Sequence, residues 1–195
     1  MNHTNSVEIL IAYFSNYIKM SEEEIELLKQ VVVYKKWKKK EIIHREGDIQ
    51  KYLAFVLKGA VRFYYIDEKG DEQTSEFVFE NTIIGQYKAL IDSNVASAYA
   101  ETIEDTELLG VSKDGLLKFL NQFPKYYAVM TDIMGDALVQ TELRNKLLRI
   151  ASSRERYEEL CRLQPQIVQR IPLTYIASYL KMALGTLSRV RAGKL

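Results

Sequence analysis

The stretch TYIASYLKMALGTLSRVR, residues 174–191, decides which fold we expect for the last part of the chain. Its apolar residues recur at helical spacing and predict two short helices with a tight break between them; the second ends in two arginines. Two such helices are typical of a helix-turn-helix, which places its second helix in a groove of DNA. The start of the second helix, Ala183-Leu184-Gly185, is atypical, because these residues neither cap a helix well nor read a base.

The charge of the chain is unevenly distributed, although its net charge is only +1. From Leu160 to Leu195 there is no aspartate or glutamate, so this segment carries +6 and the preceding residues carry about −5. Its basic residues are Arg162, Arg170, Lys181, Arg189, Arg191 and Lys194. Such a segment predicts contact with a polyanion. A solvated basic tail is the alternative, and the regular apolar pattern of the same segment argues against it.

The bulk composition fits a cytoplasmic globular protein of one large domain or two smaller ones. The 195 residues are 47% hydrophobic, which is enough for a core, and no apolar run approaches the about 18 residues of a membrane span. The N-terminus lacks the layout of a secretory signal, and the single cysteine, Cys161, cannot form an internal disulfide. We therefore expect a protein of the reducing cytoplasm with no membrane partner.

Residues for catalysis or metal binding are scarce. The two histidines, His3 and His44, lie far apart in the sequence, whereas a metal-dependent jelly-roll enzyme needs a cluster of histidine and carboxylate ligands. There is no phosphate-binding loop, dinucleotide fingerprint or Gly-x-Ser-x-Gly elbow. We interpret His44 as an ordinary strand residue and expect neither an enzyme nor a bound metal.

The first part of the chain changes from a helical to a strand pattern. Helical spacing covers the first 33 residues, and a capping box at Ser21-x-x-Glu24 opens the second helix. From Trp37 to about Val111, short strands recur at intervals of roughly ten residues, which predicts a sandwich or barrel. Residues 67–70 are expected to form a hairpin turn. Glycines at strand edges are expected at Gly47, Gly59, Gly85 and Gly110. A half-buried strand is predicted by the alternation of Val61, Phe63 and Tyr65 with Arg62 and Tyr64.

Helical periodicity returns at Lys113 to Phe123, and one long helix is predicted from Pro124 to about Ala151, with two apolar stripes. One stripe consists of Val129, Ile133, Leu143, Leu147 and Ile150. The other implies a dimer interface with the same helix of a second copy, for which we expect Tyr127, Met130, Met134, Ala137, Thr141 and Leu148. Burial within one monomer is the alternative, because the centre of the helix is polar.

A boundary follows the long helix. Ser152 and Glu155 have the spacing of another capping box, which opens a helix to about Leu163. We expect Pro165 to break this helix and Pro172 to lie in the first turn of the next one.

The order of these patterns resembles one known family. The motifs REGD (Arg45–Asp48) and FVLKGAVRFYY (Phe55–Tyr65), and the ending QRIPLTYIASYLKMALGTLSRVR, are similar to those of the Crp/Fnr superfamily of bacterial transcription regulators. The ending looks most like the short-tailed members common in Bacteroidetes-type bacteria. The resemblance covers nearly the whole chain.

The resemblance implies an α+β fold. Its parts are a cyclic-nucleotide-binding-type β-barrel (a double-stranded β-helix, or jelly roll) with flanking helices, a long dimerisation helix and a C-terminal helix-turn-helix domain. The corresponding domains are residues 1–123, the sensor; 124–151, the dimerisation helix; and 152–195, the DNA-binding domain. A dimer of this kind places its two helix-turn-helix units, here called the readers, in successive major grooves of DNA.

The resemblance also implies an effector pocket. In relatives that bind cyclic AMP, a Gly-Glu pair is followed about ten residues later by an arginine that neutralises the cyclic phosphate. The matching positions here are Gly85, Gln86, Tyr87, Ser97 and Ala98. Gln86 replaces the glutamate, and no lysine or arginine occurs between Ala89 and Lys113. Burying a phosphate without a cation is costly, so we expect no tight cyclic AMP binding and a less charged ligand, if the barrel is not simply filled by side chains.

The family's DNA-reading positions are only partly matched. The turn, usually glycine, has Lys181; the cap, usually Ser or Thr, is Ala183; and Gly185 stands where a glutamate would accept a bond from cytosine. Arg189 fits the arginine that pairs with guanine. The expected DNA-binding residues are Thr174, Tyr175, Lys181, Thr186, Ser188, Arg189, Arg191 and Lys194.

The sequence therefore predicts a homodimeric, sequence-specific transcription regulator of the Crp/Fnr type whose partner is double-stranded DNA. An unidentified small-molecule effector and RNA polymerase are further partners that the resemblance allows. The alternative is a sensor or interaction module whose reader has decayed and no longer binds DNA specifically. Ala183, Leu184 and Gly185 favour this alternative, whereas the acid-free segment and Arg189 oppose it.

Overall fold

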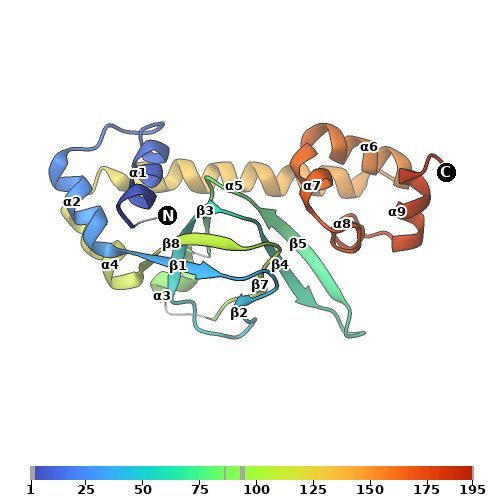
Figure 1. The fold of residues 1–195 in the computed structure, drawn as a ribbon, viewed down its shortest axis with the longest axis horizontal. Helices are drawn as coiled ribbons and strands as arrows, with labels where there is room; N and C mark the ends of the chain where they lie inside the picture. The colour runs from blue at the N-terminus through green and yellow to red at the C-terminus, as the bar shows by residue number, and fades with distance from the viewer. Residues whose placement is uncertain (1–2, 86, 93–94, 195) are drawn as a thin grey trace. The chain divides into compact units, whose positions relative to one another are not determined.

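A computed structural model describes residues 3–85, 87–92 and 95–194 (Figure 1). Within these residues the fold is α+β, as expected, with eight strands in two four-stranded sheets. The strands are β1 (Val32–Trp37), β2 (Ile42–His44), β3 (Tyr52–Lys58), β4 (Val61–Ile66), β5 (Glu72–Val78), β6 (Ile83–Ile84), β7 (Tyr99–Thr102) and β8 (Thr106–Ser112). One sheet has the order β1-β8-β3-β6 and the other β2-β7-β4-β5, so consecutive strands lie in different sheets except for the β4–β5 hairpin, as in a jelly roll.

Helices occupy the two ends of the chain and the connection between β6 and β7. They are α1 (His3–Phe14), α2 (Glu22–Val31), α3 (Tyr87–Asp92), α4 (Lys113–Gln122), α5 (Tyr126–Arg149), α6 (Ser153–Leu163), α7 (Pro165–Arg170), α8 (Leu173–Tyr179) and α9 (Leu184–Arg191). The long helix was expected and is present. Two short helices, α3 and α7, were not expected, and Pro165 begins α7 because proline suits a first helical turn.

Contacts group the chain into two compact units. The first contains residues 1–63 and 78–133, and the second contains residues 64–77 and 134–195. The division falls inside α5 and joins the tip of the β4–β5 hairpin to the C-terminal helices. This division by contacts differs from the predicted domain boundaries, which follow residues 123 and 151. The predicted domains describe which parts of the chain act together, and they stay a prediction.

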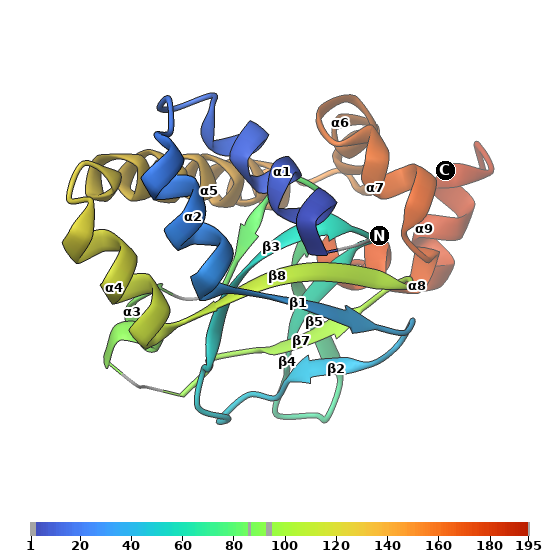
Figure 2. The same ribbon diagram turned by 60° about the vertical axis from the view of Figure 1, so that its left-hand side comes forward.

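The core of the first unit lies between helices and one sheet. Figure 2 shows α1, α2 and α4 beside the sheet that contains β1, β8 and β3. The buried side chains come from α1 (Val7, Leu10, Phe14), α2 (Leu27, Leu28), the strands (Leu53, Phe55, Leu109), α4 (Leu116, Phe119, Leu120) and the start of α5 (Tyr126, Val129, Met130, Ile133). A smaller core lies inside the barrel and includes Val56, Val61, Ala100 and Leu108.

The capping box that opens α2 is confirmed. The Ser21 hydroxyl accepts a hydrogen bond from the backbone N–H of Glu24, and the Glu24 carboxylate accepts one from the backbone N–H of Ser21 at 2.7 Å. The carboxylate also pairs with Lys125 Nζ at 2.6 Å and accepts a bond from the Tyr126 hydroxyl at 3.2 Å. Glu24 thereby joins α2 to the beginning of α5.

Two boundaries differ from the sequence expectation. The chain leaves α2 at Val31 and enters β1 at Val32, so the helical pattern ends two residues earlier than expected. Gly110 lies inside β8 rather than at a strand edge, and the Tyr52 ring packs over it: a Cβ at Gly110 would lie 3.4 Å from Tyr52 Cδ1. The predicted hairpin turn at residues 67–70 is confirmed, with Gly70 at φ +85°.

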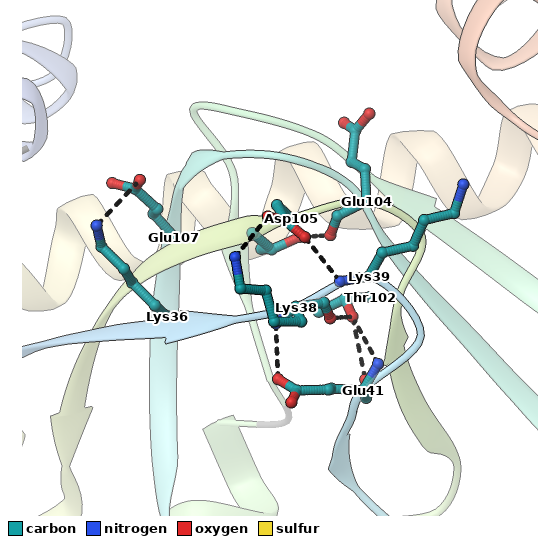
Figure 3. Close-up of polar contacts among 9 residues, drawn as sticks. Lys36, Lys38, Lys39, Glu41, Thr102, Glu104, Asp105 and Glu107 are labelled. Carbon is teal, nitrogen blue, oxygen red and sulfur yellow. Dashed lines mark hydrogen bonds and ion pairs between the residues drawn. The ribbon is translucent and has the colours of Figure 1, made fainter.

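The turn between β1 and β2 is fastened to the turn between β7 and β8 (Figure 3). Lys38 Nζ pairs with Asp105 at 3.0 Å, and the other oxygen of the same carboxylate accepts a bond from the backbone N–H of Lys39 at 3.0 Å. The Thr102 hydroxyl accepts a bond from the backbone N–H of Glu41. Nearby, Lys36 Nζ lies 3.6 Å from the Glu107 carboxylate. These contacts occupy Lys36 and Lys38 in closing one end of the barrel.

Candidate nucleic-acid interface

The helix-turn-helix consists of α8, a four-residue turn and α9, drawn in red tones in Figure 1. The sequence folds this way because one face of each helix is apolar. Ile176, Ala177 and Leu180 are buried, as are Leu187 and Val190 of α9. Helix α9 packs on α6 and α8, so its inward face is held within the second unit.

Helix α8 ends in a Schellman motif. The backbone N–H of Met182 donates to the carbonyl of Ala177 at 3.0 Å, and the N–H of Lys181 donates to that of Ser178 at 3.1 Å. Lys181 has φ +51°, a left-handed conformation that favours glycine. The lysine therefore keeps the turn geometry that glycine would supply, but with a strained backbone and an exposed cation.

The beginning of α9 is uncapped by any side chain. Ala183 takes the N-cap position, and its carbonyl accepts a bond from the N–H of Leu187 at 3.1 Å. Leu184, the first helical residue, is 44% exposed. At Gly185 an added Cβ would meet nothing within 4 Å. Ala183, Leu184 and Gly185 thus form an ordinary first helical turn. Its outer surface is apolar at Leu184 and has no side chain at Gly185.

The exposed cations of the reader are not neutralised. Lys181, Arg189, Arg191 and Lys194 are exposed and, within the described part of the chain, form no salt bridge. By contrast, Arg162 pairs with Glu159 at 2.7 Å. The other predicted DNA-binding residues lie on the same two helices: Thr174 and Ser188 are exposed, and Tyr175 and Thr186 are half-buried. The second unit therefore offers every residue predicted for DNA contact at least partly to solvent.

Two arginines that the sequence reasoning did not assign hold the reader in place. Arg156 donates from Nη1 to the carbonyl of Leu180 at 2.6 Å, and from Nε and Nη2 to the carbonyl of Ile150. Arg144 lies with its guanidinium 4.9 Å from the centre of the Tyr179 ring and donates to the carbonyl of Thr74 at 3.0 Å. Local spacing gives no signal for the contacts with Leu180, Thr74 and Tyr179, because these residues lie 24 or more positions away from their arginines.

Ser178 of α8 bonds to strand β5 within the second unit. Its hydroxyl donates to the carbonyl of Glu72 at 2.8 Å and accepts from the backbone N–H of Thr74 at 2.8 Å. Phe77 of the same strand packs on Tyr179, with ring centres 5.0 Å apart. The burial of Tyr179 raises the pKa of its hydroxyl to about 12, so this ring stays neutral.

The face of α5 predicted for dimerisation is partly exposed. Tyr127 and Met134 are exposed, as are Ala137 and Thr141, whereas Leu148 is half-buried. Met130 is only 8% exposed and packs in the core of the first unit, so it does not belong to the exposed face. Leu138, 65% exposed, lies one helical turn from Met134 and extends this face.

The barrel of the first unit encloses a cavity of about 460 Å³. Apolar walls come from Trp37, Tyr52 and Phe63, among others, and polar groups from Lys35, His44, Asp48, Gln50 and Lys51. Burial lowers the pKa of His44, whose ring lies 6.1 Å from that of Phe63. The cavity therefore combines aromatic walls with polar groups.

The predicted effector residues are only partly found at this cavity. Gly85 lines it, with φ +112° and no room for a Cβ, which would lie 2.8 Å from Gln50 Nε2. Ser97 and Ala98 are not among the described residues that line the cavity, whereas His44 is. Gln86 and the side chain of Tyr87 lie outside what the structure describes.

The cations at the cavity come from elements that the sequence reasoning did not consider. Lys35 lies on β1, with Nζ 3.6 Å above the Tyr52 ring, and Lys51 directly precedes β3. A lysine is a point charge and does not offer the paired hydrogen bonds of an arginine to a cyclic phosphate. Among the described lining residues, the cations are therefore lysines and none is the arginine of the family's phosphate clamp.

Within the described residues, no group of three or more histidine, cysteine, aspartate or glutamate side chains is arranged to hold a metal ion. None of the helices in the described ranges is both long enough and apolar enough to cross a membrane.

Comparisons with known proteins connect this fold to a family. Residues 34–123 match the family described as "Cyclic nucleotide-binding domain". The "Cyclic AMP receptor protein" of Thermus thermophilus is 25% identical over 137 residues, which are 70% of this chain and 63% of that relative. The match thus spans less than two thirds of the relative's length.

Solved structures share the fold over most of the chain. FixK2 from Bradyrhizobium japonicum is 22% identical, with a TM-score of 0.70 and 84% of each chain covered. CLP, a c-di-GMP-responsive global regulator of Xanthomonas campestris, is 15% identical, with a TM-score of 0.70 and 89% of this chain and 91% of that chain covered. These structures share the fold of the chain. Residues 34–123 are thus similar to the cyclic nucleotide-binding domain family, and the chain is similar in sequence to the Thermus thermophilus protein and in fold to FixK2 and CLP.

Proposed function

We propose that the chain is a cytoplasmic, homodimeric transcription regulator that binds double-stranded DNA in a sequence-specific manner through α9. The observation that carries the proposal is the outward face of this helix. It presents Ser188 and Arg189 on a packed helix-turn-helix, in a segment from Leu160 to Leu195 that contains no acidic residue. An acid-free basic surface on such a scaffold suits the major groove.

The residues of the reader take different roles in this proposal. Arg189 pairs with the O6 and N7 of guanine, and Thr186 and Ser188 contact neighbouring base edges. Arg191 and Lys194, at the end of α9, contact phosphates. Thr174, Tyr175 and Lys181 contact phosphates from α8 and the turn. Phosphate contacts fix the position of the protein, whereas base contacts select the sequence.

The proposed dimer forms through the exposed face of α5. Tyr127, Met134 and Thr141 are spaced by seven residues, and Ala137 lies between the last two, so they follow one seam of a two-stranded coiled coil. Leu138 flanks this seam. The solvent exposure of these residues supports the proposal, because a helix that packed only within one monomer would bury them.

The barrel cavity is the proposed effector site, with a ligand other than cyclic AMP. Its aromatic walls and few polar groups suit a small organic molecule. Contact with RNA polymerase is a further part of the proposal.

The second candidate function is that of a sensor with a decayed reader. The uncapped beginning of α9 favours it, since a missing cap costs about 0.5–2 kcal/mol of helix stability. The two candidates differ in one measurement, the retention of the full chain on duplex DNA at increasing salt. A DNA-binding regulator shows a steep linear fall of log affinity with log salt, because phosphate contacts release counterions.

The experiment compares the wild-type chain with two variants. Lys194→Ala removes an exposed cation of the reader and should reduce the salt slope by about one. Arg162→Ala is the control, because Arg162 is already paired with Glu159 and should leave the slope nearly unchanged. Selection of bound duplexes from a random pool then tests specificity. Weak retention without any selected sequence would favour the decayed reader.

A further inference from the structure

We infer that Leu184 is a specificity-determining residue that contacts the C5-methyl group of a thymine in each half-site, and that Gly185 leaves the space for this contact. The inference rests on the proposed function, since it names the base that one end of the proposed reader recognises. It treats Ala183-Leu184-Gly185 as a working part of the reader rather than as a sign of decay.

Leu184 lies where a reading helix meets the bases. The N-terminal residues of a recognition helix contact base edges, and Leu184 is the first residue of α9. Its side chain is 44% exposed, whereas Leu187 and Val190 fill the inward face of the helix. The core of the second unit therefore does not account for a leucine at this position.

The chemistry of Leu184 fits only one group on the edges of the bases. In the major groove, the thymine C5-methyl is the apolar group, and the remaining edges present hydrogen-bond donors and acceptors. A leucine offers neither donor nor acceptor, so placing it against a guanine, a cytosine amino group or an adenine would leave those polar atoms unpaired. Contact with a thymine methyl removes apolar surface from water on both sides.

Gly185 supports the same assignment. Its φ is not in the left-handed region, and an added Cβ would meet nothing within 4 Å, so the free fold does not require a glycine here. Glycine is also unfavourable inside a helix. Its benefit must therefore lie outside the free chain, and a bare backbone at the outer surface of the first turn allows close approach to a ligand.

Recognition of cytosine by a carboxylate is excluded at this end of α9, because the segment that contains the helix has no acidic residue. Cytosine is read by a carboxylate that accepts from its amino group, and no Asp or Glu occurs from Leu160 to Leu195. Arg189, five residues further along α9, supplies the guanine contact. Together they predict half-sites that contain a thymine close to a guanine.

The test uses the full chain and the duplex that it selects from a random pool. Each thymine of this duplex is replaced in turn by deoxyuridine, which removes only the methyl group. At one position in each half-site, we expect affinity to fall about fourfold per methyl lost. Leu184→Ala should bind the thymine and uracil duplexes equally well at that position. Val139→Ala, which shortens an exposed apolar side chain on α5, is the control and should keep the discrimination.

Gly185→Ala gives a second readout that a merely structural role would not produce. Because the Cβ meets open space and alanine favours helix, this variant should melt at a higher temperature than the wild type. It should nevertheless bind the selected duplex several-fold more weakly.

The outcomes separate this inference from the proposed function. A chain that binds duplex DNA with selected sequence but without any sensitivity to uracil overturns the role of Leu184 alone. The same holds if Leu184→Ala keeps the thymine preference, or if Gly185→Ala binds as tightly as the wild type. A wild-type chain that retains no duplex at any salt concentration overturns both proposals.

Discussion

Arg156 Nη1 donates a hydrogen bond to the carbonyl oxygen of Leu180 at a distance of 2.6 Å. Leu180 is the C-cap residue of α8, and the same guanidinium also donates twice to the carbonyl of Ile150, directly after α5. Carbonyls at helix ends lack helical partners, and here one planar group satisfies two of them. Arg156 thereby sets the separation of the long helix and the first helix of the reader.

Replacing Arg156 by alanine should lower the free energy of unfolding by about 1.5–3 kcal/mol, because hydrogen bonds from a charged group to half-buried carbonyls are lost. Urea denaturation of the full chain measures the change. Arg154→Ala is the matched control, since Arg154 is exposed and its pair with Glu158 lies at the surface. Its expected effect is about 0.5 kcal/mol or less. Equal effects of the two variants would contradict the role of Arg156.

Lys181→Gly should stabilise the fold and weaken DNA binding at the same time. A non-glycine residue in the left-handed region costs about 1–2 kcal/mol, and Lys181 has φ +51°. Loss of the cation should reduce the salt slope of DNA binding by about one. Thermal melting and binding at several salt concentrations check the two effects. Lys181→Ala separates them, because it removes the charge without relieving the backbone.

Arg189→Ala should weaken binding to the selected duplex by about 1–3 kcal/mol and relax the preference for guanine at one position of each half-site. Binding to unrelated duplexes should change much less. The measurement is a comparison of affinities for the selected duplex and for one with that guanine replaced. An unchanged affinity would remove the assignment of Arg189 to a base.

Calorimetry with cyclic AMP should give no micromolar affinity. The reason is the missing arginine clamp: the cavity has Lys35 and Lys51 from other elements, and Lys35 lies over the Tyr52 ring. A heat signal that saturates at micromolar cyclic AMP, and that disappears in Lys51→Ala, would show instead that a lysine replaces the clamp.

Glu24 should make the fold sensitive to acid. Burial alone would raise its pKa, but the bonds from Lys125 and Ser21 outweigh burial and lower the pKa below its usual value. A lowered pKa means that the carboxylate stabilises the fold above the unfolded pKa, near pH 4.5, and that this stability is lost as the pH falls further. Glu24→Gln should therefore cost about 1.5–3 kcal/mol at pH 7 and progressively less towards pH 3, as followed by denaturation at each pH. A constant difference would contradict this role.

Much of the fold follows from local sequence patterns. The capping box at Ser21, the turn at residues 67–70, and the inward residues of α8 and α9 depend on neighbours within a few positions, so spacing predicts them. Arg62 is different. Alternation predicts a half-buried strand with Arg62 on its other face, but this side chain is only 2% exposed and pairs with Glu101 on β7. A buried ion pair between distant strands leaves no local signal.

The candidate site was predicted to a similar extent. The cations of the reader could be identified because they lie within one short segment without acids. The supports from Arg156, Arg144 and Ser178 could not, because each acts across many residues of sequence. The lysines of the cavity were missed for the same reason: β1 and the residues before β3 meet the β6–β7 region only after the barrel has closed.

The bonds between Ser178 and β5 have a consequence for solubility. Strand β5 is the last strand of its sheet, and an edge strand with open N–H and C=O groups is a template on which other chains add. Ser178 and Arg144 occupy the outward groups of Glu72 and Thr74. We therefore expect a chain cut after residue 151 to self-associate through this edge. Helix α8, through Ser178, thus also protects the protein against aggregation.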